Sequence, residues 1–343
     1  MKFSPVFLAL VATASAQKGV RYLGRVNPAT KELTWPGTGV SFTFTGTSAG
    51  IALAAVNGAN SVELEIDGKP RVITNVTGTS IGTGALVRGK HTVQLRHRSE
   101  AEQGTIVLGD VTVKGTFGKD FAPKRQIEAI GDSITVGYGL DGELPCVNNA
   151  AVTDNPKTYA ALAAESLSAD YHVVAWSGRG VVRNYAGSPD GLPLLPELWT
   201  RYGANDADGS YTFPASWKPQ AVVINLGTND FGYVGVRDRL NATVYENAMV
   251  DFVRQIQTRY PHAEFFLLTS PMISDSYPTV EDAQKTTQTR ALTSAVKRIG
   301  AKAHLVDWPS QGSDVGCDYH PNAATHAAEA VVLADAIAGV LGW

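Results

Sequence analysis

The 343-residue chain lacks the features that mark several protein classes. Its 29 basic and 32 acidic residues nearly cancel, so nothing draws it generally to nucleic acid or to an anionic membrane. Apart from the extreme N-terminus there is no apolar run long enough for a membrane span. The motifs H-E-x-x-H, C-x-x-C and G-x-x-x-x-G-K-[ST] are absent, so we expect no metal, no cofactor and no phosphate-binding loop.

The N-terminus has the pattern of a secretion signal. Lys2 precedes the mostly apolar stretch Phe3–Val11, and Ala14-Ser15-Ala16 is a small-residue cleavage site. We expect a signal peptide at residues 1–16, a mature chain that begins near Gln17, and an extracellular protein.

Cysteine is scarce, with only Cys146 and Cys317 in the chain. An oxidising compartment permits a disulfide between them, and two separate buried thiols are the alternative. Asn75 and Asn241 begin N-x-T sequons, which become glycosylation sites if the host glycosylates secreted proteins.

Residues 17–120 predict an all-β domain, a sandwich or jelly roll, because Gly, Thr and Val are abundant and no window has helical periodicity. In residues 62–66 apolar and acidic side chains alternate, and Asp67-Gly68 then supplies a hairpin turn. The predicted strands are Val40–Thr45, Ile51–Val56, Val62–Ile66, Arg71–Asn75, His91–Arg96 and Thr105–Val113.

Residues 121–343 predict a second domain in which strands and helices alternate, after a boundary near Thr116–Lys124. This pattern is typical of a mainly parallel, five-stranded sheet between helices, a three-layer α/β/α domain. The predicted strands are Gln126–Ile130, Tyr171–Trp176, Gln220–Leu226, Glu264–Thr269 and Ala303–Val306. The predicted helices include one capped by Asn155 before Pro156, one with a Thr243–Glu246 capping box, Thr279–Ile299, and Pro321–Leu341 with Pro321 at its first position.

Four short polar motifs follow predicted strand ends. Ser133 lies in residues 131–139, Gly178 in 177–180, Asn229 in 227–230, and His320 in 318–321. The carboxyl ends of parallel strands meet at one edge of a sheet, where ligands bind. The sequence therefore predicts that these motifs form one site.

In their order and spacing, these four motifs resemble those of the SGNH hydrolases, the GDSL-type esterases. One Gly-Asp-Ser tripeptide is common by chance, but four motifs in order over residues 126–343 are specific. The resemblance implies that Ser133 is the nucleophile and His320 its base. The backbone N–H groups of Ser133 and Gly178 and the side-chain amide of Asn229 would bind the oxyanion.

Asp318, two residues before His320, could complete a triad by orienting Nδ1 of the imidazole with its carboxylate. The alternative is that a backbone carbonyl holds the imidazole. Asp132 and Asp230 are expected to be structural, accepting bonds from loop amides. With a histidine base we expect activity to fall on the acid side near a pKa of about 6.5, shifted by its partner.

The β-rich domain ahead of the catalytic unit makes the whole chain similar to carbohydrate esterase family 2, in which a jelly roll precedes an SGNH domain. The most specific motif is Gly316-Cys317-Asp318-Tyr319-His320-Pro321. The resemblance implies removal of O-acetyl groups from plant cell-wall polysaccharides such as acetylated xylan and glucomannan. Sugar rings could stack on nearby aromatics, although ordinary packing is the alternative for each: Tyr138, Trp176, Tyr185, Trp217, Trp308 and Tyr319.

Two other functions remain open at this point. One is an SGNH esterase for other short-chain esters, and the other is a carbohydrate-binding protein with a vestigial esterase domain. The expected partner is an acetylated polysaccharide or oligosaccharide, and we expect a monomer because the sequence contains no heptad pattern.

Overall fold

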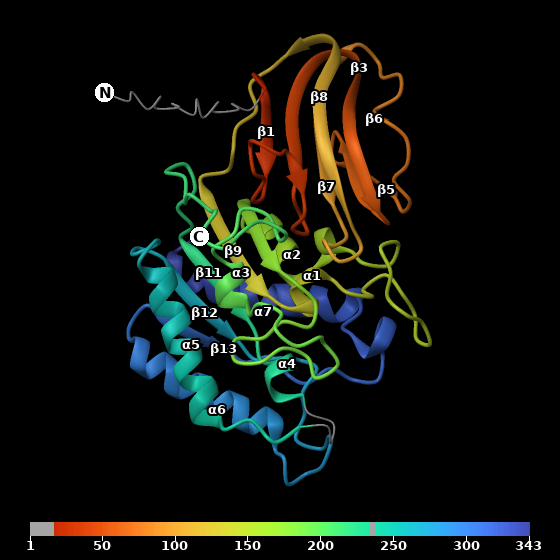
Figure 1. Cartoon of the computed structure of the whole chain (residues 1–343). Coiled ribbons are helices and arrows are strands. Elements are labelled where there is room, and N and C mark those ends of the chain that lie inside the picture. The colour runs from red at the N-terminus through yellow and green to blue at the C-terminus, as the bar shows by residue number, and fades with distance from the viewer. Residues whose placement is uncertain (1–16, 233–236) are drawn as a thin grey trace, which may run out of the picture.

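The computed structural model describes residues 17–232 and 237–343. It consists of a β-rich domain packed against an α/β domain, and the chain passes from one to the other between Phe117 and Arg125 (Figure 1). Both predicted fold types, an antiparallel β domain and a three-layer domain with a five-stranded parallel sheet, are confirmed. The expected signal peptide lies outside the described residues.

One long strand, β3 (Gly39–Gly58), organises the β-rich domain. Its first part pairs with β1 and β7, its pairing with β8 runs from Phe44 to Gly58, and β6 pairs with residues 50–52, so the one strand connects most of this sheet. Side chains from both parts of β3, such as Phe42 and Leu53, meet in one core. The other strands are β1 (Val20–Leu23), β2 (Glu32–Leu33), β4 (Val62–Ile66), β5 (Lys69–Ile73), β6 (Ser80–Gly82), β7 (Gly89–His97) and β8 (Gly104–Phe117).

The hairpin predicted at Asp67-Gly68 is present between β4 and β5. Both turn residues have positive φ, 52° at Asp67 and 75° at Gly68, as a two-residue turn of type I′ requires. The Asp67 carboxylate adds a bond from the backbone N–H of Thr92 at 2.9 Å, which ties the turn to β7.

The second sheet has the order β10-β9-β11-β12-β13, and every neighbouring pair is parallel. β9, the first strand of the domain, therefore lies between β10 and β11. The chain adds β10 on one side of β9 and then adds β11, β12 and β13 on the other, so the strand order reverses at β9. Ligands bind beyond the carboxyl ends of the strands at such a reversal. The strands are β9 (Arg125–Gly131), β10 (Ala169–Ala175), β11 (Ala221–Asn225), β12 (Glu264–Leu268) and β13 (Ala303–Val306).

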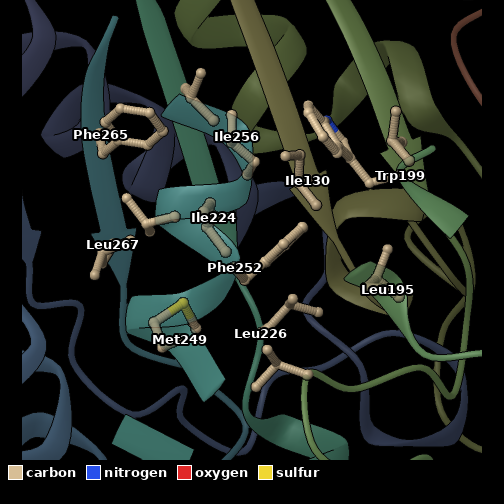
Figure 2. Packing of buried hydrophobic residues seen from close by; sticks show 14 of the residues in the cluster. Ile130, Leu195, Trp199, Ile224, Leu226, Met249, Phe252, Ile256, Phe265 and Leu267 are labelled. Carbon is tan, nitrogen blue, oxygen red and sulfur yellow. The ribbon is translucent and has the colours of Figure 1, made fainter. Parts of the chain in front are cut away.

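Alternate strand residues face two separate cores. On one face, Ile130, Ile224 and Phe265 pack with Met249 and Phe252 of α5 (Figure 2). On the other face the core is shared with α2 and α7. The longer helices are α2 (Tyr159–Ser166), α5 (Ala242–Gln257), α6 (Gln284–Ile299) and α7 (Ala323–Leu341), and the short ones are α1 (Ser133–Val136), α3 (Leu195–Leu198), α4 (Thr228–Phe231) and the 3₁₀ turns Asn155–Lys157 and Cys317–Tyr319.

Two predicted helix starts were wrong because a neighbouring asparagine caps the helix. α5 is capped by Asn241, whose Oδ1 accepts from the N–H of Thr243 at 2.9 Å, so Thr243 lies inside the first turn. α7 is capped by Asn322, which accepts from the N–H of Thr325 at 3.1 Å. Pro321 therefore precedes the helix instead of opening it.

Two further helices begin later than predicted. Asn155 and Pro156 form a 3₁₀ turn, and Thr158 caps α2. α6 begins at Gln284 because the Asp282 carboxylate accepts bonds from the N–H and hydroxyl of Thr279 at 3.1 and 2.9 Å, which stabilises a local turn instead.

Among the described residues, the segment Cys317–Leu341, which includes α7, is long and apolar enough to cross a membrane by length and composition. The core helix of a soluble protein passes the same test. Leu333 and Ile337 on one face of α7 are fully buried in the sheet core, so the apolar character of this helix has a packing explanation.

A buried ion pair joins the two domains. Arg25 of the β-rich domain donates to Glu128 of β9 at 2.7 Å, and neither side chain is exposed. Glu128 also accepts from the indoles of Trp199 and Trp217 at 2.6 and 2.8 Å, and from the hydroxyl of Tyr260 at 3.2 Å. The carboxylate is thus surrounded by donors, which offsets the cost of its burial.

We expect Glu128→Ala to destabilise the protein by about 3–5 kcal/mol, because it leaves Arg25 charged and unpaired in the interface. Urea unfolding measures this. Asp208→Ala is the matched control, because it removes the exposed pair of Arg201 and Asp208, worth about 0–1 kcal/mol. A Glu128→Ala protein as stable as this control would contradict the assigned role.

Candidate active site

The four predicted motifs meet at the carboxyl edge of the parallel sheet. Ser133 follows β9, Gly178 follows β10 and Asn229 follows β11, the three strands that flank the reversal in chain order. His320 comes from the distant segment between β13 and α7. The topology of the sheet thus brings together residues that are up to 187 positions apart.

Ser133 and His320 are in hydrogen-bond contact, with 2.9 Å between Oγ and Nε2. Ser133 begins the short helix α1, and the carboxylate of Asp132 caps this helix by accepting from the N–H of Ile134 at 3.1 Å. The serine is 5% exposed, so it is largely buried but still reaches the surface. A hydroxyl on a positioned imidazole is the arrangement that activates a serine nucleophile.

The imidazole of His320 is oriented by a backbone carbonyl. Its Nδ1 lies 3.1 Å from the carbonyl oxygen of Asp318, which only accepts, so Nδ1 carries the proton and Nε2 offers its lone pair to Ser133. Burial lowers the pKa of His320 to about 4, below the value of about 6.5 expected for a free imidazole. The ring is therefore neutral at neutral pH.

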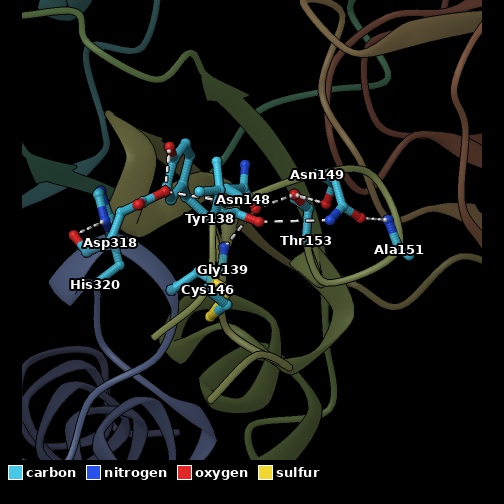
Figure 3. The surroundings of a disulfide bond; sticks show 11 residues. Tyr138, Gly139, Cys146, Asn148, Asn149, Ala151, Thr153, Asp318 and His320 are labelled. Atoms are coloured by element: carbon cyan, nitrogen blue, oxygen red, sulfur yellow. Dashed lines mark hydrogen bonds between the residues drawn. A yellow bond between two sulfur atoms is a disulfide. The ribbon is translucent and has the colours of Figure 1, made fainter. Parts of the chain in front are cut away.

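The predicted contact between the Asp318 carboxylate and His320 is wrong. That carboxylate accepts from the hydroxyl of Tyr138 at 3.0 Å and from the N–H of Asn148 at 3.0 Å (Figure 3). The ring of Tyr138 packs on the imidazole, with 4.2 Å between centroids. Asp318 has a φ of 50°, and this left-handed backbone turns its carbonyl, not its side chain, toward Nδ1.

The predicted disulfide between Cys146 and Cys317 is present (Figure 3). It joins the loop after Ser133 to the loop that carries His320. Two backbone bonds reinforce it, from Cys317 N–H to the Gly139 carbonyl at 3.0 Å and from Asp318 N–H to the Cys146 carbonyl at 3.2 Å. A Cβ at Gly139 would meet Cys317 at 2.7–3.0 Å, so only glycine allows this approach.

The candidate oxyanion donors lie on the adjoining loops. The N–H groups of Ser133 and Gly178 have no hydrogen-bond acceptor within residues 17–232 and 237–343, which leaves both free for a substrate. The Asn229 amide donates to the Arg179 carbonyl at 2.9 Å and to Asp132 at a longer 3.3 Å. Donation to an oxyanion would replace the longer of these contacts.

The two neighbouring aspartates hold the loops, as predicted. Asp230 accepts from three successive backbone N–H groups, those of Val181, Val182 and Arg183, at 2.7–3.1 Å. Asp132 caps α1, and burial raises its pKa to about 7. Neither carboxylate touches Ser133 or His320 through a hydrogen bond.

The predicted sugar-stacking aromatics differ in their exposure. Tyr185 and Tyr319 are 56% and 67% exposed, so their rings are available to a ligand. Trp308 and Trp217 are 1% and 4% exposed, and they pack on Tyr159 and His172, so their assignment to the substrate was wrong. Tyr138 packs its ring on His320 and donates its hydroxyl to Asp318, so it is already occupied within the protein.

The half-buried Trp176 faces the domain interface. Its ring is edge-on to Trp35 at 6.5 Å between centroids, and its indole donates to Glu102 at 3.4 Å. Asn75 and Asn241 are both exposed, and their glycosylation stays a prediction.

Sequence reasoning missed the β-domain residues that reach the site. Glu100 is 3% exposed and bonds to Ser177, the residue before Gly178. In the sequence, Arg98-Ser99-Glu100 has the pattern of an ordinary solvated turn, and no local signal marks its burial. Within the described ranges, no group of three or more His, Cys, Asp or Glu side chains is placed to hold a metal ion.

Comparisons with known proteins agree with this architecture. Residues 22–119 match the carbohydrate esterase 2 N-terminal family, and residues 129–328 match the GDSL-like lipase/acylhydrolase family. The chain is 32% identical to the cellulase/esterase CelE of Acetivibrio thermocellus over 95% of its own length but 40% of that protein. It is also 32% identical to an acetylxylan esterase/glucomannan deacetylase of Cellvibrio japonicus, over 86% of this chain and 82% of the relative.

Solved structures extend the similarity. A carbohydrate esterase family 2 enzyme with a carbohydrate-binding domain from Corynascus thermopiles (Myceliophthora fergusii) is 68% identical with a TM-score of 0.93, over 94% of this chain and 100% of that one. A family two carbohydrate esterase from Clostridium thermocellum in complex with cellohexaose is 29% identical with a TM-score of 0.83, over 95% and 100% of the two chains. With both of its domains matched, the chain belongs to carbohydrate esterase family 2.

Proposed function

We propose that the protein is a secreted serine esterase that removes O-acetyl groups from plant cell-wall polysaccharides such as acetylated xylan and glucomannan. The observation that carries the proposal is the 2.9 Å contact between Ser133 Oγ and His320 Nε2, with Nδ1 fixed by a carbonyl. The named activity of the Cellvibrio relative supports the substrate class, and the cellohexaose complex of another relative supports recognition of a sugar polymer.

The proposed reaction begins when Ser133 attacks the acetyl carbonyl carbon while His320 Nε2 takes the hydroxyl proton. The oxyanion that forms accepts bonds from the N–H groups of Ser133 and Gly178 and from the Asn229 amide. As the intermediate collapses, the imidazolium protonates the leaving sugar hydroxyl. Water, activated by the same imidazole, then hydrolyses the acetyl-serine and releases acetate.

The surroundings of the nucleophile suit a substituent on a polymer. The exposed rings of Tyr185 and Tyr319 offer faces on which sugar rings can stack. Because an acetyl group is small, it needs little room beside the 5% exposed Ser133. The two competing functions, hydrolysis of other short-chain esters and carbohydrate binding without catalysis, are separated by the substrate comparison below.

We expect the wild type to release acetate from acetylated xylan or glucomannan and Ser133→Ala to release none above background. Losing the nucleophile of a serine hydrolase costs about 10⁶-fold in kcat. Acetate release is measured on both polymers and on a short synthetic acetyl ester. Cleavage of the synthetic ester alone would contradict the polysaccharide assignment, and no release from any of the three would favour the binding protein.

The acid limb of the pH profile should lie near pH 4. The base acts only when neutral, and burial lowers the pKa of His320 to about 4, so kcat/KM should persist through pH 5–6 and fall as pH drops through that pKa. Initial rates on a synthetic acetyl ester from pH 3 to 8 test this. A limb near about 6.5, the value for a solvated imidazole, would contradict desolvation of this partly buried ring.

Asp318→Asn should lower kcat by less than about 10-fold, whereas loss of a triad aspartate costs about 10⁴-fold. The reason is that the backbone carbonyl, which the substitution keeps, orients His320. Asparagine also tolerates the left-handed φ of 50° at this position. Steady-state kinetics beside His320→Ala provide the comparison, and equal losses in the two variants would show that the carboxylate is essential.

A further inference from the structure

The turn between β7 and β8, residues 98–103, reaches from the β-rich domain into the candidate active site. Arg98 is fully buried and donates to Asp154 at 2.8 Å, to Asp141, and to the Ala151 carbonyl at 3.3 Å. Gln103 donates to Thr153 Oγ1 at 2.9 Å. These contacts tie the turn to the loop that follows the nucleophile helix α1.

The same turn also holds the loop after β10. Glu100 Oε2 accepts from the backbone N–H of Ser177 at 2.9 Å, and Oε1 accepts from the Ser177 hydroxyl at 2.6 Å. Glu100 therefore binds one residue with both carboxylate oxygens. That residue directly precedes Gly178, whose N–H is a candidate oxyanion donor.

The conformation of this loop makes its anchoring important. The Arg179 N–H donates to the Trp176 carbonyl at 3.3 Å, which closes a four-residue turn with Ser177 and Gly178 at its centre. Gly178 has a φ of 77°, the value of a type II turn. A type I turn with the same ends differs mainly in the central peptide, which is rotated by roughly half a turn. That peptide carries the Gly178 N–H, so the turn type decides where the donor points.

We propose that Glu100 is a positioning residue of the active site, which fixes the Ser177–Gly178 peptide so that the Gly178 N–H faces the developing oxyanion. The inference rests on the proposed esterase function, because it concerns the donor set of that reaction. It gives the β-rich domain a part in catalysis: the domain supplies the group that sets the geometry of a donor on the other domain.

Both charge states of Glu100 can make these contacts. Burial is the main cause that raises the pKa of this carboxyl to about 7, and the two hydrogen bonds from Ser177 are the largest effects that oppose it. The ionised form accepts both Ser177 bonds. The neutral form accepts from the N–H while donating its own proton to the hydroxyl. Glutamine reproduces this second arrangement, so Glu100→Gln is a conservative variant and Glu100→Ala a disruptive one.

The kinetic test compares Glu100→Ala, Glu100→Gln and the wild type on a synthetic acetyl ester. We expect Glu100→Ala to lower kcat by about 10–100-fold with KM within about twofold, since an oxyanion donor acts mainly in the transition state and is worth up to about 10²–10³-fold. Glu100→Gln should keep at least about a third of wild-type kcat. Asp110→Ala, at an exposed acidic residue of β8 in the same domain, is the matched control and should keep the full rate.

Ser177→Ala tests the same contact without changing the β-rich domain, in case Glu100→Ala does not fold. It removes one of the two bonds, so a kcat loss of about 3–10-fold with unchanged KM is expected. The double variant should be no slower than Glu100→Ala. Unchanged kcat in Glu100→Ala, or in Ser177→Ala where only that variant folds, would overturn the inference, as would a loss that Glu100→Gln fails to rescue.

A crystal structure of Glu100→Ala, or of Ser177→Ala where only that variant folds, distinguishes failure of this inference from failure of the proposed function. We expect the Ser177–Gly178 peptide to be rotated or to occupy two orientations. A peptide that keeps its wild-type orientation overturns the positioning role. If the wild type cleaves no acetyl ester, the proposed function fails, and this structure still decides whether Glu100 sets the peptide.

Discussion

The hydrogen bond from His320 Nδ1 to the carbonyl of Asp318 is the constraint on which the candidate site depends. It selects the tautomer that leaves Nε2 free for Ser133, and it does so with a backbone atom, whose position depends on the fold of its loop. The left-handed φ values of 50° at Asp318 and 63° at Tyr319 aim that carbonyl at the ring. Such a backbone persists only when its surroundings hold it.

The contacts around this loop supply that support. The Cys146–Cys317 disulfide attaches its start to the loop after the nucleophile, and the close approach of Gly139 to Cys317 keeps the two loops in contact. The Asp318 carboxylate, freed from the imidazole, binds Tyr138, whose ring packs on His320. The same few residues thus fix the base from its backbone side and from one ring face.

The sequence was sufficient for the parts of this site that local patterns encode. Parallel sheet topology required Ser133, Gly178 and Asn229 to meet, because each follows a strand end. The orientation of the Asp318 side chain could not be predicted from the sequence, because an Asp two residues before a histidine can present either its carboxylate or its backbone carbonyl to the ring. The assignments of Trp308 and Trp217 to the substrate were wrong for a related reason: an aromatic residue close to a strand end has the same sequence pattern whether its side chain is exposed or packed.

Burial between domains was the least predictable property. Arg25, Arg98 and Glu100 are 0–3% exposed, although charged residues in turns are usually solvated. The free-energy cost of burying each charged side chain is offset by partners from the opposite domain, such as Glu128 for Arg25 and Asp154 for Arg98. No window of the sequence contains both members of such a pair.

An imidazole held by a carbonyl differs physically from one paired with a carboxylate. A carboxylate would favour the charged ring by a full opposite charge, whereas a carbonyl offers a dipole, and burial then dominates and lowers the pKa to about 4. The ring is a weaker base, yet almost all of it is in the active form at neutral pH. In the proposed reaction the imidazolium is less stabilised, so more of the transition-state charge must be balanced on the other side, at the oxyanion. Under that proposal the geometry of the Ser133, Gly178 and Asn229 donors carries more of the barrier than it would in a full triad. Buried carboxylates from both domains, Glu100 and Asp230, accept bonds from the loop that bears Gly178, as a donor set under this demand requires.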